Sequence, residues 1–397
     1  MDKIVIVGAS AAGISAADAL RQRGFTGRIT LLGSEPHLPY DRPPLSKQLL
    51  SGQWEPERLR LRSAEQLTEL DLNLRLGATA TGLDPHRREV ALAEGEPVDY
   101  DGLIIATGAA PRRLHGGDLA GVHYLRTLDD ALALRPRMRP ESRMVVIGAG
   151  FIGAEAAAVA RDIGLSVTMV DPAAAPMVRA LGKSVSELLA ALHVDRGVDL
   201  RCGTGVSSLL SEQGAVAGVV LDTGERLPAD VVVVGIGAIP NTGWLAGSGL
   251  LSDGRLDSDE YCAVGPDVYA AGDVASWFNP LFGTRMRVEH RTSAAEHARA
   301  AATNLLAAPA DRRPFASVPY FWTDQYDLKL QVWGHFDESC DLVVRHGDLS
   351  ERKFVALYGR DGRVVGAVGA GMPKQLREAR RLIVEKAEFP GQGSHVA

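Results

Sequence analysis

Cysteine is scarce in this sequence of 397 residues, which contains three: Cys202, Cys262 and Cys340. They lie far apart, so their local spacing forms neither a CxxC redox pair nor a zinc knuckle. Free cysteine is usually an interior residue, and we therefore expect small buried side chains here rather than reactive thiols.

The sequence also lacks long apolar runs and a surplus of basic residues. No run approaches the ~20 residues that a membrane-spanning helix needs, and an apolar segment begins at Lys3, which leaves no room for a signal peptide. The formal net charge is −6, whereas nucleic-acid-binding domains usually carry a basic surplus. We therefore expect a cytoplasmic protein with no membrane and no nucleic acid among its partners.

The residues that are present are typical of a globular α/β protein. The chain is 46% hydrophobic and 23% charged, and at about 150 residues per domain its length favours two or three domains. Helical patterns and apolar runs alternate along much of it. We expect helices over residues 128–134, 292–306 and 373–386, and buried strands over residues 101–105 and 268–271.

The first 35 residues have the form of a βαβ dinucleotide-binding unit. The turn after the first apolar run contains the small residues Gly8, Ser10, Ala12 and Gly13. Gly8 permits a tight turn, and Gly13 lets the following helix pack closely on the sheet. Glu35 lies 22 residues after Gly13, near the spacing at which an acid accepts a hydrogen bond from an adenosine ribose. Ser10 departs from the fingerprint, which has glycine there, and an ordinary βαβ turn is the alternative interpretation.

A second unit of the same form begins near residue 143 and is complete. Gly148, Gly150 and Gly153 form GxGxxG between a strand and a helix, and Asp171 ends the next strand 18 residues later. An acid at this point favours a free ribose 2′-hydroxyl and repels a 2′-phosphate, which predicts a preference for NADH. Arg179 nearby keeps NADPH possible.

Two dinucleotide units in one chain suggest one resident and one diffusible dinucleotide, as needed to pass a hydride from nicotinamide to flavin. Glu155, on the helix after Gly153, is a candidate for the nicotinamide end of the second site. The alternative is an acid placed early in a helix and favoured by the helix dipole.

Small residues follow three further apolar runs, where the carboxyl ends of parallel strands place ligands. Thr107 and Gly108 follow the first run, Gly237 follows the second, and Asp273 follows the third. We expect the backbone at these turns to approach a nucleotide, and the Asp273 carboxylate to meet a polyol hydroxyl of a flavin. Plain strand-ending turns are the alternative.

Arg42 and Lys47 are the candidate cations of a proline-rich segment, residues 36–52. The prolines delay any helix until about Leu45, so we place Arg42 on a stiff loop and Lys47 in the first turns of a helix. A cation beside a flavin stabilises the negative charge that develops on reduction. Two solvated charges are the alternative.

The C-terminal part, from Phe315, changes in composition towards strands. Asp361 and Gly362 between two apolar runs predict a hairpin, so we expect an antiparallel sheet with a closing helix. Four aromatic residues near its start form either core or a cofactor wall: Tyr320, Phe321, Trp322 and Tyr326.

Eight motifs in order resemble the FAD-dependent ferredoxin reductases of bacterial oxygenase and cytochrome P450 systems, of the putidaredoxin reductase and biphenyl dioxygenase reductase type. The motifs are GASAAG, ITLLGSEPHLPYDRPPLSK, IIATGAAPR, VVIGAGFIGAE, VVVVGIGAIPN, VYAAGDVA, RVEH and PYFWTDQYD. The resemblance covers nearly the whole chain. It implies a glutathione-reductase-like fold with two Rossmann-type domains and a C-terminal α+β domain.

The resemblance also implies domain boundaries and residue roles. A discontinuous FAD-binding domain would cover 1–108 and 235–312, an NAD-binding domain 109–234, and a C-terminal domain 313–397. The residues implied to contact FAD are Glu35, Arg42, Lys47, Asp273, Glu289 and Trp322, with Lys47 near the ring and Trp322 towards the electron acceptor. Glu155 would lie by the nicotinamide. Arg291 departs from the family, whose members often carry tryptophan there.

One absence distinguishes subfamilies on this fold. Disulfide reductases and NADH peroxidases of related type need a redox cysteine beside the flavin, and residues 41–52 contain none. Electrons would then pass directly to a partner, and a flavin that accepts a hydride and releases single electrons suits a 2Fe-2S ferredoxin. The sequence therefore predicts an NADH:ferredoxin oxidoreductase that uses FAD and NADH and serves an oxygenase or cytochrome P450.

Three alternatives stay open at this stage. One is a rubredoxin reductase or an NADH oxidase, another is a redox-sensing protein resembling apoptosis-inducing factor, and the third is a dinucleotide binder without flavin. Because ferredoxins tend to be acidic, a basic docking face is expected. Its candidate residues are Arg285, Arg287, Arg291, Arg312, Arg313, Arg377, Arg380 and Arg381.

Overall fold

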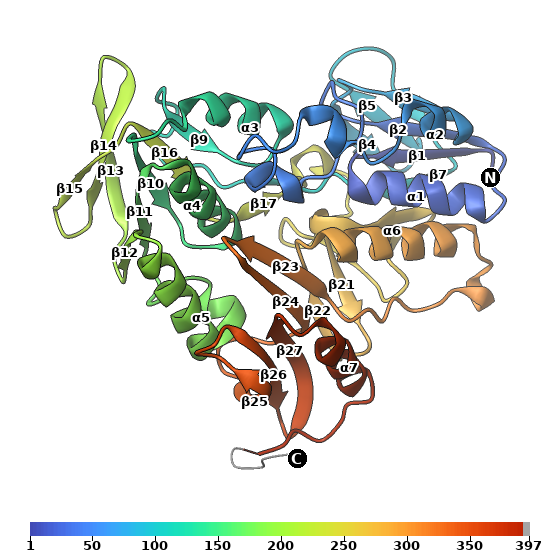
Figure 1. Cartoon of the computed structure of the whole chain (residues 1–397). Coiled ribbons are helices and arrows are strands. Elements are labelled where there is room, and N and C mark those ends of the chain that lie inside the picture. The colour runs from blue at the N-terminus through green and yellow to red at the C-terminus, as the bar shows by residue number, and fades with distance from the viewer. Residues whose placement is uncertain (392–397) are drawn as a thin grey trace. The chain divides into compact units, whose positions relative to one another are not determined.

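The computed structural model describes residues 1–391, which divide into two compact units (Figure 1). Among the described residues, unit 1 contains 1–41, 57–110 and 239–319, and unit 2 contains 42–56, 111–238 and 320–391. The chain passes between the units near β8 (Ala109–Pro111) and β17 (Ala238–Pro240). The short segment 42–56 is grouped with unit 2, although the chain on both sides of it belongs to unit 1.

Unit 1 is built on a six-stranded sheet of order β19-β20-β7-β1-β2-β3. The bounds are β19 (Ala263–Gly265), β20 (Val268–Ala270), β7 (Gly102–Ile105), β1 (Lys3–Val7), β2 (Arg28–Leu32) and β3 (Leu72–Arg75). All neighbouring pairs are parallel except β19 with β20. Parallel strands are buried on both faces, which explains the nearly continuous apolar runs of β1, β2 and β7.

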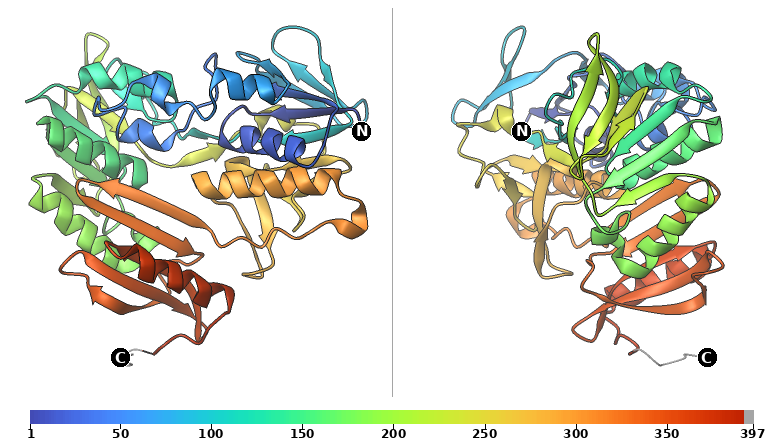
Figure 2. Two further views of the ribbon diagram at one scale, coloured as in Figure 1. Left: turned by 45° about the vertical axis from the view of Figure 1, so that its right-hand side comes forward. Right: turned by 90° about the vertical axis from the view of Figure 1, so that its left-hand side faces the viewer.

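Two alanine-rich helices of unit 1, α1 (Ala11–Gln22) and α6 (Arg291–Leu306), pack side by side (Figure 2). Ala16 and Ala17 of α1 and Ala298 and Ala301 of α6 are fully buried in one core. Their small side chains let the two helices approach closely. The remaining elements are α2 (Ala64–Glu69) and two small sheets: β4 (Ala80–Asp84), β5 (Glu89–Leu92) and β6 (Val98–Asp99); and β18 (Leu256–Ser258), β21 (Ala275–Asn279) and β22 (Thr284–Met286).

Unit 2 contains a five-stranded parallel sheet of order β12-β11-β10-β16-β9. Its strands are β12 (Asp199–Cys202), β11 (Ser166–Asp171), β10 (Arg143–Ile147), β16 (Val231–Val234) and β9 (Val122–Tyr124). The helices of this part are α3 (Leu128–Leu134), α4 (Phe151–Ile163) and α5 (Val178–Asp195), and the antiparallel strands are β13 (Val206–Glu212), β14 (Ala215–Leu221) and β15 (Arg226–Pro228). The four valines of β16 are all buried, as expected for a central parallel strand.

A second sheet of unit 2 is antiparallel, with the order β23-β24-β27-β26-β25. Its strands are β23 (Tyr320–Gln325), β24 (Leu328–Gly334), β27 (Arg363–Ala370), β26 (Lys353–Arg360) and β25 (Asp341–Asp348), and α7 (Pro373–Val384) packs on β27. Asp361 and Gly362 join β26 to β27, and both have positive φ, 51° and 69°. The predicted hairpin is confirmed, because this tight turn needs left-handed residues at both positions.

The predicted α/β class, with two mainly parallel sheets and a C-terminal antiparallel sheet, is confirmed with one local correction. The helix predicted from about Leu45 is wrong. The segment forms a short 3-10 turn, η1 (Pro43–Ser46), and Lys47 leaves helical geometry with φ −126° and ψ −98°. The side chains of Ser46 and Lys47 bind Glu155 instead, so tertiary contacts override the local pattern. The helices α2 and α5 were not predicted.

The buried ring of His297, on α6, makes the stability of unit 1 depend on pH. Its ring is buried and stacks on Phe315 at 4.9 Å, and burial lowers the pKa of this histidine from 6.5 to about 3. The unfolded chain therefore takes up a proton below pH 6.5 that the folded chain does not. The contribution of the neutral His297 ring to stability is therefore fully present above pH 6.5 and is lost as the pH falls.

We predict that His297→Phe reduces the loss of stability between about pH 7.5 and 5.5 by about 1 kcal/mol. Thermal melting at the two pH values measures this. His86→Phe, at an exposed histidine, is the matched control and should leave the difference as in the parent. An unchanged difference in His297→Phe would contradict the role of His297.

Candidate functional site

The first dinucleotide turn lies at the carboxyl end of β1 in unit 1. Gly8 has φ +117°, and a Cβ there would lie 2.1 Å from the carbonyl oxygen of Ala106. A Cβ on Gly13 would lie 1.9 Å from the carbonyl oxygen of Gly8. Neither position tolerates a side chain. Ser10, by contrast, is the extended N-cap of α1, with φ −105° and no capping bond from its hydroxyl.

Residues from three other segments gather around this turn. The carboxyl ends of β1, β7 and β20 share one edge of the sheet because these strands are parallel. Thr107 is held there by Asn241, whose amide donates to the Thr107 carbonyl at 2.8 Å. A Cβ on Gly272 would lie 3.2 Å from Cβ of Ala12, which brings η5 (Gly272–Val274), the carrier of Asp273, to the turn.

Several candidate FAD ligands of unit 1 make polar contacts of their own. Glu35 follows β2, and its Oε2 accepts a hydrogen bond from the Tyr40 hydroxyl at 2.5 Å. Gly108 adopts φ +67°, and its carbonyl accepts from the backbone nitrogen of Asn241 at 2.9 Å. Glu289 pairs with Arg287 at 2.6 Å. These residues are fixed by neighbours within the unit.

The second turn, at the carboxyl end of β10 in unit 2, repeats the same backbone restrictions. Gly148 has φ +101°, and a Cβ there would lie 2.3 Å from the carbonyl oxygen of Gly235. A Cβ on Gly153 would lie 2.0 Å from the carbonyl oxygen of Gly148. On Gly150 the nearest atom would be 3.9 Å away. The protein itself therefore requires the first and third glycines and leaves space at the second.

That open space fits a dinucleotide. In such turns the second glycine allows the pyrophosphate to approach the backbone at the N-terminus of a helix, and here α4 begins directly after Gly150. Ser10 occupies the equivalent position of the first turn. Because the fold does not require glycine at this position, the departure at Ser10 is sterically compatible with the same backbone.

Asp171 lies beside the second turn. Its Oδ2 accepts from the backbone nitrogen of Ala149 at 2.7 Å, and its Oδ1 accepts from that of Ala173 at 2.8 Å. A carboxylate offers about four acceptor positions, so two stay available. Gly237, after β16, has φ +100° and its carbonyl accepts from the nitrogen of Arg112 at 2.9 Å.

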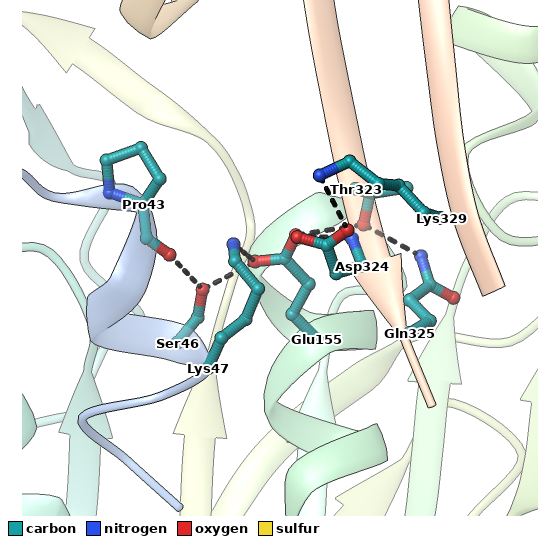
Figure 3. A network of polar contacts seen from close by, with 8 residues as sticks. All are labelled: Pro43, Ser46, Lys47, Glu155, Thr323, Asp324, Gln325 and Lys329. Atoms are coloured by element: carbon teal, nitrogen blue, oxygen red, sulfur yellow. Dashed lines mark hydrogen bonds and ion pairs between the residues drawn. The ribbon is translucent and has the colours of Figure 1, made fainter. Parts of the chain in front are cut away.

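A buried ion pair joins Lys47 to Glu155 of α4 in unit 2 (Figure 3). Lys47 Nζ lies 2.8 Å from Glu155 Oε2, and the residues are 9% and 3% exposed. Ser46 Oγ donates to the same oxygen at 2.5 Å, and Thr323 Oγ1 donates to Glu155 Oε1 at 2.9 Å. Sequence reasoning singled out Lys47 and Glu155 separately but did not predict that they bind each other.

Arg42 and Trp322 also belong to unit 2. The Arg42 guanidinium donates to the carbonyl of Arg126 at 2.5 Å. Trp322 is half-buried on β23, and its ring stacks with that of Tyr320 at 5.9 Å. The contacts of Arg42, Lys47 and Trp322 with a flavin stay predictions.

Two of the three cysteines, Cys202 and Cys262, are poor candidates for redox chemistry. Burial raises the pKa of the Cys262 thiol far above its ordinary value and that of Cys202 to about 11. Reactivity requires the thiolate. Cys202 and Cys340 are half-buried rather than buried, which differs from our expectation, and all three are free. Within residues 1–391, no group of His, Cys, Asp and Glu side chains forms a metal site.

Several basic docking candidates of unit 1 are occupied by internal contacts. Arg285 donates to the carbonyls of Ser258 and Ser276, and Arg291 pairs with Asp41. Arg291 is the first residue of α6, and its ion pair with Asp41 gives a structural role to the arginine that stands where family members often carry tryptophan. In the part of the chain that the structure describes, no helix is long and apolar enough to cross a membrane.

Comparison with known families and proteins gives matches along nearly the whole chain. The family described as Pyridine nucleotide-disulphide oxidoreductase matches residues 2–302, and the one described as Reductase C-terminal matches residues 320–392. Rhodocoxin reductase of Rhodococcus erythropolis is 39% identical, over 96% of this chain and 89% of its own. The anthranilate 1,2-dioxygenase system ferredoxin–NAD(+) reductase component of Burkholderia cepacia is 39% identical, over 97% and 95%.

Solved structures agree with these matches. The ferredoxin reductase for the CYP199A2 system from Rhodopseudomonas palustris has a TM-score of 0.93 at 36% identity, covering 98% of this chain and 96% of that one. The covalent putidaredoxin reductase–putidaredoxin complex gives a TM-score of 0.91 at 34% identity, covering 97% and 93%. The chain therefore belongs to the pyridine nucleotide-disulphide oxidoreductase family, within its FAD-dependent ferredoxin reductases, as the resemblance in the sequence predicted.

Proposed function

We propose that this protein is an NADH-dependent flavoprotein reductase that passes electrons from NADH through FAD, one at a time, to a 2Fe-2S ferredoxin. The observation that carries the proposal is the repetition of one backbone-enforced dinucleotide turn in both units, in a chain whose cysteines are free and far apart. The ferredoxin would serve an oxygenase or a cytochrome P450.

The names of the relatives support the partner. One relative named above is the ferredoxin–NAD(+) reductase component of a dioxygenase system, and one solved neighbour is a covalent complex of putidaredoxin reductase with putidaredoxin. The absence of a cysteine from residues 41–52 supports direct transfer from flavin to the partner, since no thiol there is available to carry electrons.

Each of the two glycine-containing turns would hold one dinucleotide. The residues proposed for FAD are Gly8, Ser10, Ala12, Gly13, Glu35, Arg42, Lys47, Thr107, Gly108, Asp273, Glu289 and Trp322. Those proposed for NADH are Gly148, Gly150, Gly153, Glu155, Asp171 and Gly237. The flavin supplies the chemistry, since it accepts a hydride and releases single electrons. The chain contributes the turns that seat pyrophosphates and the acids that select a ribose.

The predicted domain division and location are part of this proposal. Separate sheets support an FAD-binding domain of 1–108 with 235–312, an NAD-binding domain of 109–234 and a C-terminal domain of 313–397. A cytoplasmic location is consistent with a supply of NADH.

The function is tested by reduction of a 2Fe-2S ferredoxin with NADH and NADPH side by side. We expect turnover with NADH, and a preference over NADPH that Asp171→Asn reduces about tenfold, because a negative charge repels the 2′-phosphate. Asp222→Asn is the matched control, since that exposed carboxylate also caps a turn, at Gly205. Negligible ferredoxin-supported turnover would refute the proposed function. A preference of the parent for NADPH would refute the role of Asp171.

The two glycine positions of the second turn predict separable effects. Gly150→Ala should leave the melting temperature close to that of the parent but raise the KM for NADH about tenfold, because its Cβ meets only the ligand. Gly153→Ala should destabilise the protein, because its Cβ would lie 2.0 Å from the Gly148 carbonyl. Equal loss of stability in both variants would contradict this division.

The exposed arginines of α7 are the proposed docking face for the acidic ferredoxin. Arg377, Arg380 and Arg381 are all exposed. Replacing the three with Glu should lower the ferredoxin-dependent rate about tenfold or more and weaken its salt dependence, since opposite charges steer association. Reduction of a small-molecule acceptor by NADH should be unchanged.

The control for α7 replaces three exposed arginines of unit 1 with Glu: Arg23, Arg60 and Arg87. This variant carries the same change in net charge. If it slows ferredoxin reduction as much as the α7 variant does, the effect reflects overall charge and α7 is not the docking face.

A further inference from the structure

A continuous chain of hydrogen bonds leads from Tyr326 to Glu155 inside unit 2. The Tyr326 hydroxyl lies 3.2 Å from His193 Nδ1, and His193 Nε2 lies 2.9 Å from Gln325 Oε1. Gln325 Nε2 donates to Thr323 Oγ1 at 3.1 Å, and Thr323 Oγ1 donates to Glu155 Oε1 at 2.9 Å (Figure 3). The chain connects α5, β23 and α4.

The residues between the two ends are almost fully buried. Thr323 is 1% exposed, and Gln325 and His193 are 0% exposed. Thr323 and Gln325 alternate along β23, so both side chains point to the same face of the strand. Asp324 between them points the other way, where its carboxylate lies 3.7 Å from Lys329 Nζ. The three middle members of the polar chain are thus enclosed by protein.

Only one direction of donation satisfies every member of this chain. A carboxylate accepts hydrogen bonds and donates none, so the Thr323 hydroxyl gives its proton to Glu155. The same hydroxyl then accepts from the amide nitrogen of Gln325, and the amide oxygen of Gln325 faces His193. His193 must therefore carry its proton on Nε2 and accept from Tyr326 at Nδ1.

The burial of His193 is consistent with that single tautomer. Loss of hydration lowers the pKa of this histidine from 6.5 to about 4, although the hydrogen bond with Gln325 opposes the shift. The ring is neutral at neutral pH, so it has one donor and one acceptor nitrogen. Both are used within the chain.

Glu155 receives donors from the opposite side as well. Its Oε2 accepts from Ser46 at 2.5 Å and from Lys47 at 2.8 Å, and its Oε1 is approached by the backbone nitrogen of Asp324 at 3.4 Å. Every polar neighbour recorded for this carboxylate is a donor.

We propose that His193 and Gln325 orient Thr323 as a donor to Glu155, and that all three are positioning residues which fix this carboxylate at the nicotinamide site. This inference rests on the proposed function, in which the second turn takes NADH. A fixed carboxylate is a directional acceptor for the amide of a nicotinamide. The polar chain makes the placement of this acceptor depend on β23, a strand of the C-terminal sheet.

Thr323→Val tests the proposal, because valine has nearly the same shape but neither donates nor accepts. The dissociation constant for NAD+, measured by calorimetry, and the KM for NADH should both rise about tenfold, as expected when a hydrogen bond to a charged group is lost. Thr323→Ser keeps the hydroxyl and should stay within about twofold of the parent.

The matched control is Thr30→Val in unit 1. Thr30 is also a buried strand threonine, and its hydroxyl accepts from Asn73 at 3.2 Å. If the role of Thr323 is only structural, both valine variants will melt lower and neither will change NAD+ affinity. Unchanged affinity in Thr323→Val, or failure of Thr323→Ser to restore it, would overturn the proposal.

A second measurement does not depend on any ligand. Nitrogen-15 spectra of the histidine rings in the parent protein should show His193 with its proton on Nε2 at neutral pH, and the Nδ1-protonated tautomer would refute the direction of the chain. If the parent shows the expected tautomer but binds no NAD+ and is not reduced by NADH, the proposed function itself is wrong. If the parent binds NAD+ and is reduced by NADH but Thr323→Val leaves the affinity unchanged, only the positioning role is wrong.

Discussion

The buried carboxylate of Glu155 is the constraint on which unit 2 depends. A charge taken out of water is costly unless donors replace its hydration, and breaking a buried pair costs roughly 3–5 kcal/mol. Here the donors come from two segments far apart in the sequence: Ser46 and Lys47 in one, and the Thr323 hydroxyl with the Asp324 backbone nitrogen in the other. Satisfying this one group therefore fixes a loop, a helix and a strand together.

The same requirement explains why residues 42–56 are grouped with unit 2. The prolines of this segment permit a 3-10 turn, but Lys47 then leaves helical geometry and its side chain reaches Glu155. The contact also explains why the segment has no longer helix. A buried ion pair provides specificity of arrangement more reliably than net stability, and here the arrangement places a cation and an anion beside the N-terminal turns of α4.

The dinucleotide turns depend on a different constraint, the space around backbone atoms. In both units the first and third small-residue positions are occupied by glycine because a Cβ would meet a carbonyl oxygen at about 2 Å or slightly more. The second position is open in the protein, which accounts for glycine in one turn and serine in the other. The fold thus requires glycine at the first and third positions, whereas only the ligand favours glycine at the second. Ser10 departs from the ligand's requirement alone.

The sequence by itself determined the features that depend on neighbours along the chain: the two βαβ units, the helix 128–134, the hairpin at Asp361 and Gly362, and the absence of a thiol after Glu35. These follow from periodicity, turn geometry and composition, which are local. It also singled out Lys47 and Glu155 as functional, and their charges could be interpreted separately. Only the tertiary structure decided that Lys47 and Glu155 pair and that no helix forms near Leu45. It also decided that a polar chain runs through Thr323, Gln325 and His193. Those contacts join residues more than a hundred positions apart, and no local pattern records which buried donor will meet which buried acceptor.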